Sequence, residues 1–192
     1  MDKSIKNITA IIMVAFMTFS FATVEKVKKE INLETSKVTW KGYKVTGSHQ
    51  GTIDIKKGNL LFDDNKLVGG GFIIDMSSIV VTDLEGEYKD KLEGHLKSDD
   101  FFGINNFPTA SLTFKKVKST GKNSYEVTGD ITIKKKTETI KFDISIYGNK
   151  ANASLKIDRT KFDVRYGSTS FFDNLKDKAI YDDFDLVADL EF

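Results

Sequence analysis

YEVTGDITIKKKTETIKFDISIYGNKANASLKI, residues 125–157, decides the fold of this chain. Within it, segments 125–133, 140–146 and 151–157 each alternate apolar and polar side chains residue by residue. A period of two with one polar face is typical of antiparallel strands that bury one face and expose the other. Three such strands joined by short links predict a sheet of sequential neighbours.

The rest of the chain continues this pattern. Further strands are predicted at 37–45, 50–57, 59–62, 66–76, 110–118 and 184–192, which gives eight or nine strands. Many amphipathic strands with short links indicate a sandwich or an up-and-down β-barrel, and a barrel also removes exposed strand edges. No internal repeat, linker or low-complexity tract is present, so we expect one all-β domain.

One helix is expected to interrupt the strands. Thr82 and Glu85 have the spacing of a capping box, and apolar residues recur every fourth position along 83–97. This pattern predicts a helix over 83–97 that lies across one end of the sheet. A shorter helical turn is expected at 174–178.

The N-terminus has the layout of a cleavable signal peptide. Two lysines precede an apolar run too short to span a bilayer comfortably, and Ser20 and Ala22 are the small residues expected before a cut. We therefore expect residues 1–22 to be a signal peptide and 23–192 the exported domain, with no transmembrane segment after cleavage. An uncleaved N-terminal anchor is the alternative.

Removal of this leader leaves a neutral domain without cysteine. The leader takes two of the 29 Lys and Arg residues and one of the 28 Asp and Glu residues, which leaves 27 of each sign. A chain without net charge has no overall field to attract nucleic acid, so we expect no nucleic-acid partner. Without cysteine neither a disulfide nor a lipoprotein anchor can form, and the core alone must hold the fold.

No sequence motif of a catalytic centre is present. The chain lacks a nucleophile elbow, a zinc-protease helix motif, a phosphate-binding loop and a cysteine nucleophile. His49 and His95 could share a metal with Asp99 or Asp100, but their spacing is not typical of a metal site. A His95 side chain that caps the helix end or bonds a loop carbonyl is the better interpretation. We therefore expect no metal, no cofactor and no enzyme activity.

Aromatic residues are abundant, with 15 Phe, six Tyr and one Trp. Most must belong to an ordinary core, but a barrel of about eight strands can be filled by side chains or left hollow for one small ligand. Gly69, Gly70 and Gly71 remove side chains either at a barrel corner or where a ligand approaches. Composition does not decide between a filled and a hollow barrel.

A series of separated motifs resembles the YceI-like family along essentially all of residues 23–192. The N-terminal motifs are W-x-G (Trp40, Gly42), G-x-H-x-G (Gly47, His49, Gly51), I-D-M-S-S-I (Ile74–Ile79) and Asp83. The central motifs are L-x-x-H-L-K-S-x-D-F-F (Leu92–Phe102) and F-P-T-A (Phe107–Ala110). The C-terminal motifs are D-R-T-K-F-D-V-R-Y-G-S (Asp158–Ser168), F-F-D-N (Phe171–Asn174) and D-K-A-I-Y-D-D-F (Asp177–Phe184).

The resemblance implies an extended, lipocalin-like antiparallel β-barrel with one helix at an end, exported to the bacterial periplasm. It also implies binding of a long polyisoprenoid lipid in the barrel lumen. Phe162 departs from the pattern, because the family often has tryptophan there, but another aromatic residue should still pack. We therefore expect non-catalytic binding, storage or transport of an isoprenoid or similar amphiphilic lipid, with a homodimer left open.

An apolar lumen could bind a prenyl chain without any catalytic group, because burial of apolar surface yields about 25 cal/mol per Å². The inward faces of the predicted strands supply the expected lining. The expected lumen residues are Trp40, Phe72, Ile74, Leu112, Phe114, Val127, Ile131, Phe142, Ile144 and Phe184.

Other residues are expected at the mouth of the barrel, close to the lipid head group. The mouth and lid residues are His95, Ser98, Phe101, Phe102, Arg159, Arg165 and Tyr166. Arginine suits phosphate recognition, and this chain has only Arg159 and Arg165. The alternative is that both arginines pair with aspartates such as Asp158, Asp163 or Asp173, because a buried charge must be matched.

The predicted helix and the loop 98–107 leave one strand and enter the next, so they are expected to form a lid. Phe101 and Phe102 are adjacent in this loop. In an extended backbone they should point in opposite directions, one toward the lipid and one toward neighbouring structure.

Two other functions are weighed beside lipid binding. An enzyme that acts on an isoprenoid or quinone precursor is disfavoured by the scarcity of acid–base groups. An envelope protein-interaction module would use the aromatic residues as a docking surface. Extracted lipid would support binding, turnover of an isoprenoid would support the enzyme, and a co-purifying protein would support the module.

Overall fold

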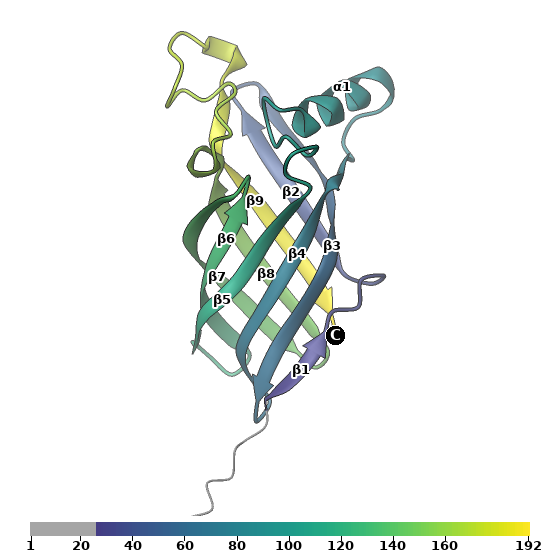
Figure 1. Cartoon of the computed structure of the whole chain (residues 1–192), viewed down its shortest axis with the longest axis vertical. Coiled ribbons are helices and arrows are strands. Elements are labelled where there is room, and N and C mark those ends of the chain that lie inside the picture. The colour runs from purple at the N-terminus through teal and green to yellow at the C-terminus, as the bar shows by residue number, and fades with distance from the viewer. Residues whose placement is uncertain (1–25) are drawn as a thin grey trace, which may run out of the picture.

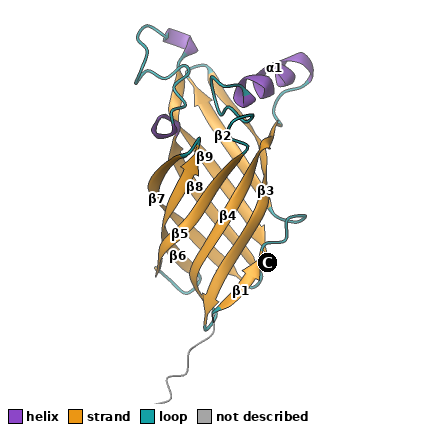
Figure 2. Cartoon of the chain, in the orientation of Figure 1, coloured by secondary structure: helices purple, strands orange, loops and turns teal. Residues whose placement is uncertain are grey.

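A computed structural model describes residues 26–192, so the predicted signal peptide of residues 1–22 lies outside the described residues. The described chain is mostly β, with one α-helix and two short 3₁₀ helices (Figures 1 and 2). Its strands are β1 Val27–Glu30, β2 Lys37–Lys44, β3 Gly47–Asp63, β4 Lys66–Val81, β5 Thr109–Ser119, β6 Ser124–Ile133, β7 Lys136–Tyr147, β8 Lys150–Asp158 and β9 Ile180–Glu191. Its helices are α1 Gly86–Lys97, η1 Arg159–Phe162 and η2 Lys176–Lys178.

Eight of the strands close into one antiparallel barrel. They pair in the order β3-β2-β9-β8-β7-β6-β5-β4, and pairing of β3 with β4 completes the ring. β1 adds a short ninth strand to β3. Closure pairs the strands that would otherwise form the two edges of an open sheet. The predicted β-barrel of about eight strands with one helix is therefore confirmed, and the sandwich alternative is excluded.

The alternating segments form the strands that they predict. In β6 and β8 every second side chain is buried. β6 pairs with β7 in an unbroken register from Ser124–Ser145 to Ile133–Lys136, so the inward faces of these strands coincide. Phe162, the departure from the motif pattern that was expected still to pack, is 1% exposed and lies in the core.

Three predicted strand features differ from the structure. Residues 50–57 and 59–62 form one strand, because Gly58 pairs with Phe72 and carries the ladder through. β4 runs past Met76 to Val81. β1 is not predicted, because four residues are too few to show a period.

Ser78 of the I-D-M-S-S-I motif supports the continuation of β4. The β3–β4 register shifts between Thr52 and Asp54, which marks a bulge. There the Ser78 hydroxyl accepts a hydrogen bond from the Asp54 amide at 2.8 Å and donates one to the Asp75 carbonyl at 2.6 Å. A side chain thus replaces a missing ladder bond, so the two strands stay paired beyond the bulge.

Helix α1 lies at the upper end of the barrel beside β4 (Figure 1). It begins at Gly86, after Glu85, so the predicted start at 83 and the capping box are wrong. Thr82 instead donates its amide and hydroxyl to the Gln50 carbonyl, which keeps it attached to β3. The turn expected at 174–178 is confirmed in part, as η2. Across residues 26–192, no helix has both the length and the apolar character needed to cross a membrane.

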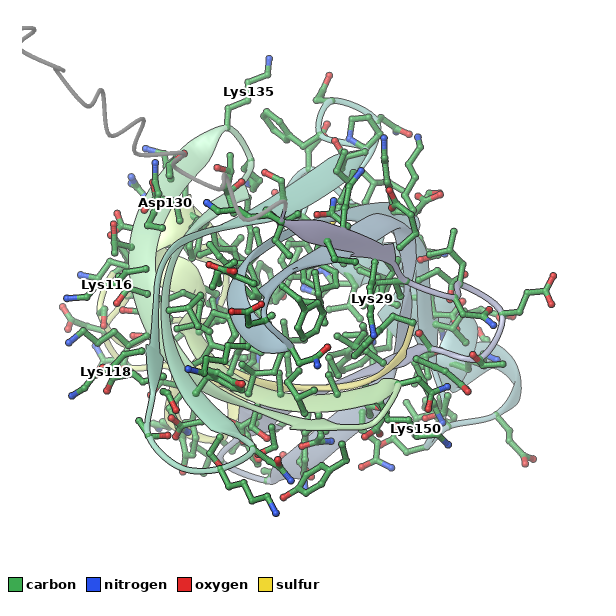
Figure 3. All side chains as sticks on the ribbon, turned by 90° about the horizontal axis from the view of Figure 1, so that it is seen from below. Lys29, Lys116, Lys118, Asp130, Lys135 and Lys150 are labelled. Carbon is green, nitrogen blue, oxygen red and sulfur yellow. The ribbon has the colours of Figure 1, made fainter. Side chains whose placement is uncertain are left out.

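The lower end of the barrel is closed by a filled core. Figure 3 views this end and shows Lys29 within the outline of the barrel. The Lys29 ammonium lies 5.2 and 5.0 Å from the ring centroids of Phe62 and Phe192. These two rings are 5.4 Å apart, so an aromatic pair with a cation above it seals this end.

Candidate functional site

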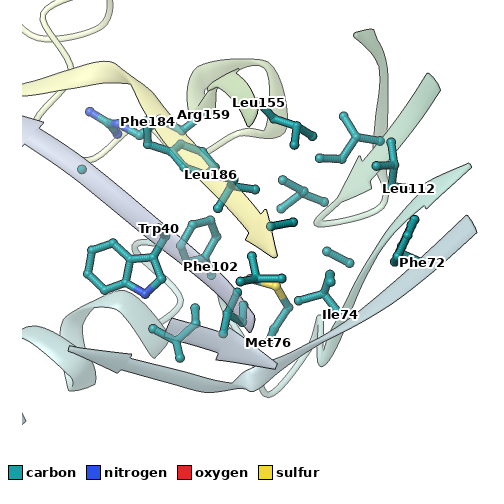
Figure 4. Close-up of a pocket in the computed structure, with 18 of the residues that line it drawn as sticks. Trp40, Phe72, Ile74, Met76, Phe102, Leu112, Leu155, Arg159, Phe184 and Leu186 are labelled. Carbon is teal, nitrogen blue, oxygen red and sulfur yellow. The ribbon is translucent and has the colours of Figure 1, made fainter. Parts of the chain in front are cut away.

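The upper part of the barrel encloses an apolar cavity of about 170 Å³. All eight barrel strands, α1 and the segment after α1 contribute to its wall. Figure 4 shows Phe72 and Leu112 at one end of this wall, with Trp40 and Arg159 toward the other. Ile180 and the exposed Tyr181 also line it, so the cavity reaches the surface at the upper end.

Nine of the ten expected lumen residues line this cavity. They are Trp40, Phe72, Ile74, Leu112, Phe114, Ile131, Phe142, Ile144 and Phe184. Val127 does not line it, because this fully buried side chain belongs to the filled core. Binding of a lipid by these residues stays a prediction.

The wall also contains residues that were not expected to line it. The additional apolar ones include Val38, Ile53, Ile55, Met76, Ile79, Ala153, Leu155, Leu186, Ala188 and Leu190. The alternation already places Ala153, Leu155 and Leu186 on inward faces, so their signal was present in the sequence. Ile53 and Ile55 alternate with polar residues within 50–57, so their signal was present as well.

Both phenylalanines of the expected lid line the cavity. Residues 99–102 form a turn, so the expectation that Phe101 and Phe102 point in opposite directions is wrong. Their rings lie edge to face with centroids 5.0 Å apart. Phe102 also lies 6.5 Å from Phe184 of β9, so the lid packs across the cavity onto the far wall.

Arg159 is a buried cation at the upper edge of the cavity, only 2% exposed. Its Nε donates to the Tyr181 carbonyl, and one Nη donates to Val164 and Tyr166 carbonyls. The other Nη donates to the Ile180 carbonyl and lies 3.6 Å from an Asp182 carboxylate oxygen. The guanidinium therefore holds together the segment between β8 and β9.

Arg165 is exposed and pairs with an aspartate, which is the alternative to head-group recognition. Its exposed Nε lies 2.7 Å from an Asp163 carboxylate oxygen, and its guanidinium stacks 4.8 Å from the Phe171 ring centroid. Arg165 and Tyr166 do not line the cavity. They line a separate surface hollow with Asp99, Asp100, Lys134, Asp163 and Phe172.

His95 and Ser98 also lie off the cavity. The His95 ring packs against Phe101 and Tyr166, with centroids 5.4 and 4.4 Å away. Its buried Nε2 has no hydrogen-bond partner among the described residues, so the expected side-chain cap or carbonyl bond does not form. Burial lowers the pKa of His95, against an opposing effect of Asp100. Ser98 instead donates its hydroxyl to the His95 carbonyl and ends the helix.

His49 makes a different kind of contact from His95. Its Nδ1 lies 3.0 Å from an Asp83 carboxylate oxygen, and the other oxygen of Asp83 accepts the Gln50 amide. This contact ties the start of β3 to the chain that leads into α1. Between residues 26 and 192, no three His, Cys, Asp or Glu residues are grouped as a metal would require.

Few polar groups border the cavity. The Trp40 indole donates to the Thr52 carbonyl at 3.3 Å, so its polar atom is satisfied within the barrel wall. The Tyr43 hydroxyl lies 2.6 Å from Asp185; this hydrogen bond raises the pKa of Tyr43 and lowers the pKa of Asp185. In the described part of the chain, Arg159 and Asp183 are the charged residues among those lining the cavity. The arrangement can hold an apolar body and offers little for acid–base chemistry.

A model of the YceI-like domain matches residues 27–192. UPF0312 proteins of Pseudomonas putida strains W619 and GB-1 are each 30% identical over 98 residues, 51% of this chain and 49% of theirs. The matched part thus spans about half the length of these curated relatives.

Solved structures share the fold. BcnA of Burkholderia cenocepacia has a TM-score of 0.63 and 23% identity, covering 83% of this chain and 98% of that protein. A polyisoprenoid binding domain from Saccharophagus degradans, implicated in plant cell wall breakdown, has a TM-score of 0.58 and 12% identity, covering 84% and 95%. The YceI protein of Campylobacter jejuni has a TM-score of 0.54 and 20% identity, covering 100% and 92%.

Proposed function

Because the chain belongs to the YceI-like domain family, we propose that its barrel binds an isoprenoid or a similar long-chain amphiphilic lipid without chemical turnover. The observation that carries the proposal is the apolar cavity, which is sealed at the lower end and reaches the surface at the upper end. A similarly folded protein is a polyisoprenoid binding domain, which supports this class of ligand. Storage or transport of the lipid follows, because a lipid chain inside a barrel is separated from water.

The wall chemistry favours a chain over a polar ligand. Apolar surface moved out of water contributes about 25 cal/mol per Å², while a polar group placed in the cavity would lose its hydration without gaining partners. Trp40, the one polar-tipped aromatic deep in the wall, already uses its N–H on Thr52. The ligand must therefore leave its head group at the upper end.

Two places at the upper end differ in their capacity to meet a head group. Arg159 directs its donors at four carbonyls, so it has little left for a phosphate. The surface hollow at the upper end contains Lys134, Arg165 and Tyr166 together with Asp99, Asp100 and Asp163, so it offers a head group both donors and acceptors near solvent. We propose this hollow as the head-group end of the site.

Native mass spectrometry of the purified protein, followed by organic extraction, tests the proposal. Ile144 is 1% exposed and lines the cavity, so Ile144→Trp should occupy ligand space and lower the amount of bound lipid. Ile73→Trp is the matched control, because Ile73 is 39% exposed and does not line the cavity. A folded Ile144→Trp protein that retains as much lipid as the control would contradict a site at this depth.

A second candidate is a protein-interaction module. The observation that favours it is a set of exposed aromatic residues, Tyr166, Phe171 and Phe172, in the segment between β8 and β9. A defined protein that co-purifies with the native chain but not with Phe171→Ala/Phe172→Ala would support it. Recovery of an isoprenoid in altered form would instead support an enzyme.

We further propose that the protein works in the periplasm after removal of residues 1–22. The leader layout supports this proposal, because a short apolar run is followed by small residues at the expected cut. Intact-mass measurement of periplasmic material should give a chain that begins at Thr23. A mass that retains the leader would overturn the cleavage.

A further inference from the structure

Three phenylalanine rings from three different strands meet deep in the cavity wall. Phe72 of β4 and Phe114 of β5 have ring centroids 6.0 Å apart, and Phe114 and Phe142 of β7 have centroids 5.5 Å apart. All three line the cavity, so we call Phe72, Phe114 and Phe142 the floor. Phe114 contacts both of the other rings and forms its centre.

Glycines make room for the floor. A Cβ at Gly58 would lie 2.7 Å from the Phe72 ring and 3.0 Å from Ile31. A Cβ at Gly70 would lie 3.0 Å from the Phe114 ring and 3.1 Å from Leu60. Each glycine therefore lies where a floor ring on one side meets a buried core residue on the other.

The barrel is filled beneath the floor. The buried residues there do not line the cavity; they include Ile31, Leu60, Phe62, Leu67, Tyr125 and Val127. Leu60 and Val127 are 0% exposed, so these strands are tightly packed below the rings. On β3, β4 and β6 the floor therefore separates the lumen from a packed core, whereas on β7 and β9 the cavity wall continues past it to Ile144 and Leu190.

We propose that the floor sets the longest lipid chain that the barrel accepts in full. This inference rests on the proposed lipid-binding function and adds a length limit to it. A chain that enters from the upper end advances until it meets the three rings. Further carbons must then stay outside the cavity, in water, where they add no binding free energy.

Binding of linear prenols of increasing length tests the proposal on the purified protein. Trp40 is the only tryptophan of the chain and lines the cavity, so its fluorescence reports binding. The dissociation constant should fall about fourfold for each methylene-sized group that enters the cavity, and then reach a plateau. The chain length at the plateau measures the depth of the lumen.

Two substitutions should move this plateau in opposite directions. Phe114→Ala removes the centre of the floor and should shift the plateau to longer prenols. Ile74→Phe adds a ring to the wall beside the floor and should shift it to shorter ones. Phe62→Ala is the matched control, because Phe62 is 5% exposed but does not line the cavity, and it should leave the plateau unchanged.

The outcomes separate this inference from the function on which it rests. If the native protein binds no prenol of any length, the proposed function fails and the floor has no role. If prenols bind and either folded variant keeps the native plateau, the floor is overturned while lipid binding stands. Should Phe114→Ala not fold, Ile74→Phe decides alone, because it removes no buried contact.

Discussion

Arg159 is a buried charge that stabilises the segment between β8 and β9 rather than a free ligand group. Four carbonyls accept from its guanidinium, and Asp182 lies nearby. The Arg159 guanidinium also lies over the Phe101 ring, 5.6 Å from its centroid, so the same side chain supports the lid. A buried charge with this many partners is strongly destabilising to disrupt, because its hydration cannot be recovered.

We expect Arg159→Lys to lower the free energy of unfolding by about 3 kcal/mol or more, because one ammonium cannot reach four separate carbonyls. Arg165→Lys is the control: its ion pair with Asp163 is exposed, so the change should cost about 1 kcal/mol or less. Urea unfolding curves for both variants measure the difference. Equal losses would show that Arg159 does not hold this segment.

The two arginines also show what a sequence can say about single residues. Both lie in one motif, next to aspartates, and nothing in their spacing tells the buried one from the exposed one. η1 separates them: Arg159 begins it and faces the barrel, while Arg165 lies beyond its end. Which of them could meet a head group therefore depended on a local turn that the alternation of residues does not encode.

His95 makes stability depend on pH. Burial lowers its pKa below the ordinary 6.5, with Asp100 opposing, so the unfolded chain takes up this proton at a higher pH than the folded one. Stability therefore rises with pH just below 6.5 and is lost as the pH falls through that window. Aspartates whose folding lowers their pKa, such as Asp182, act at lower pH, below their ordinary 3.8.

We expect the melting temperature to fall between about pH 7 and about pH 5, in the window that His95 governs. His95→Phe should flatten this slope, because phenylalanine keeps the ring contacts with Phe101 and Tyr166 and cannot take up a proton. Thermal melts at matched ionic strength measure it. A variant with the native slope would assign the pH dependence to other groups.

At the scale of elements, the segment from α1 to β5 is built as a lid. Leu96 of α1 and both Phe101 and Phe102 line the cavity, and the Met76 amide of β4 donates to the Pro108 carbonyl of this segment at 3.0 Å. The Lys134 ammonium donates to the Phe101 carbonyl at 2.8 Å, which attaches the lid to the β6–β7 turn. The lid is therefore held at a few points around the mouth.

Replacing both Phe101 and Phe102 with alanine should leave a folded protein that releases its ligand several-fold faster, because lids govern exchange. Each buried Phe→Ala change costs up to about 3–5 kcal/mol, and less where the side chain borders a cavity. Tyr88→Ala/Tyr147→Ala is the matched control, because these exposed aromatic residues line neither the cavity nor the surface hollow. Dye-displacement kinetics and melting temperatures should be measured on one preparation.

A different pair of results would contradict the role of this segment as a lid. A large fall in melting temperature with an unchanged release rate would make Phe101 and Phe102 a structural plug instead of a lid. Equally fast release from the control pair would show that the effect is not specific to the lid.

Elements were predictable to different degrees for physical reasons. Regular alternation located β6 and β8, because each buries every second side chain along its length, and it located the larger part of β7 and β9. The start of α1 was not predictable, because Thr82 has the residue type of a cap and yet stays bonded to Gln50. Local spacing alone could not show that Thr82 would bond to a strand instead of capping the helix.

At the scale of the whole molecule, alternation predicts which side chains point inward but not how high they lie. Val127 and Phe142 are register partners in β6 and β7, and both point into the barrel. Phe142 lines the cavity, whereas Val127 is buried in the core below. Strands of a closed barrel are tilted against its axis, so paired residues differ in height. Which inward side chains line the cavity and which fill the core thus required the structure.

Closure of the barrel also depends on single positions where strands crowd together. Gly51 of β3 pairs with Trp40 in β2 and with Val81 in β4, so three strands meet at this residue. A Cβ there would lie 1.8 Å from the Val80 carbonyl oxygen and 2.7 Å from the Trp40 ring. The backbone oxygen cannot give way without opening the β3–β4 ladder that completes the ring.

We therefore expect Gly51→Ala to lower the free energy of unfolding by about 3 kcal/mol, the upper part of the range for an overpacked core. Gly42→Ala is the control, because Gly42 lies in neighbouring β2 and a Cβ there meets no atom within 4 Å. The control should change stability by less than about 1 kcal/mol. Chemical unfolding should stay a single transition for both variants, because a closed ladder couples all eight strands. If Gly51→Ala instead matches Gly42→Ala, the approach of β4 to β3 at this point does not govern closure, and the glycine serves only the packing of Trp40.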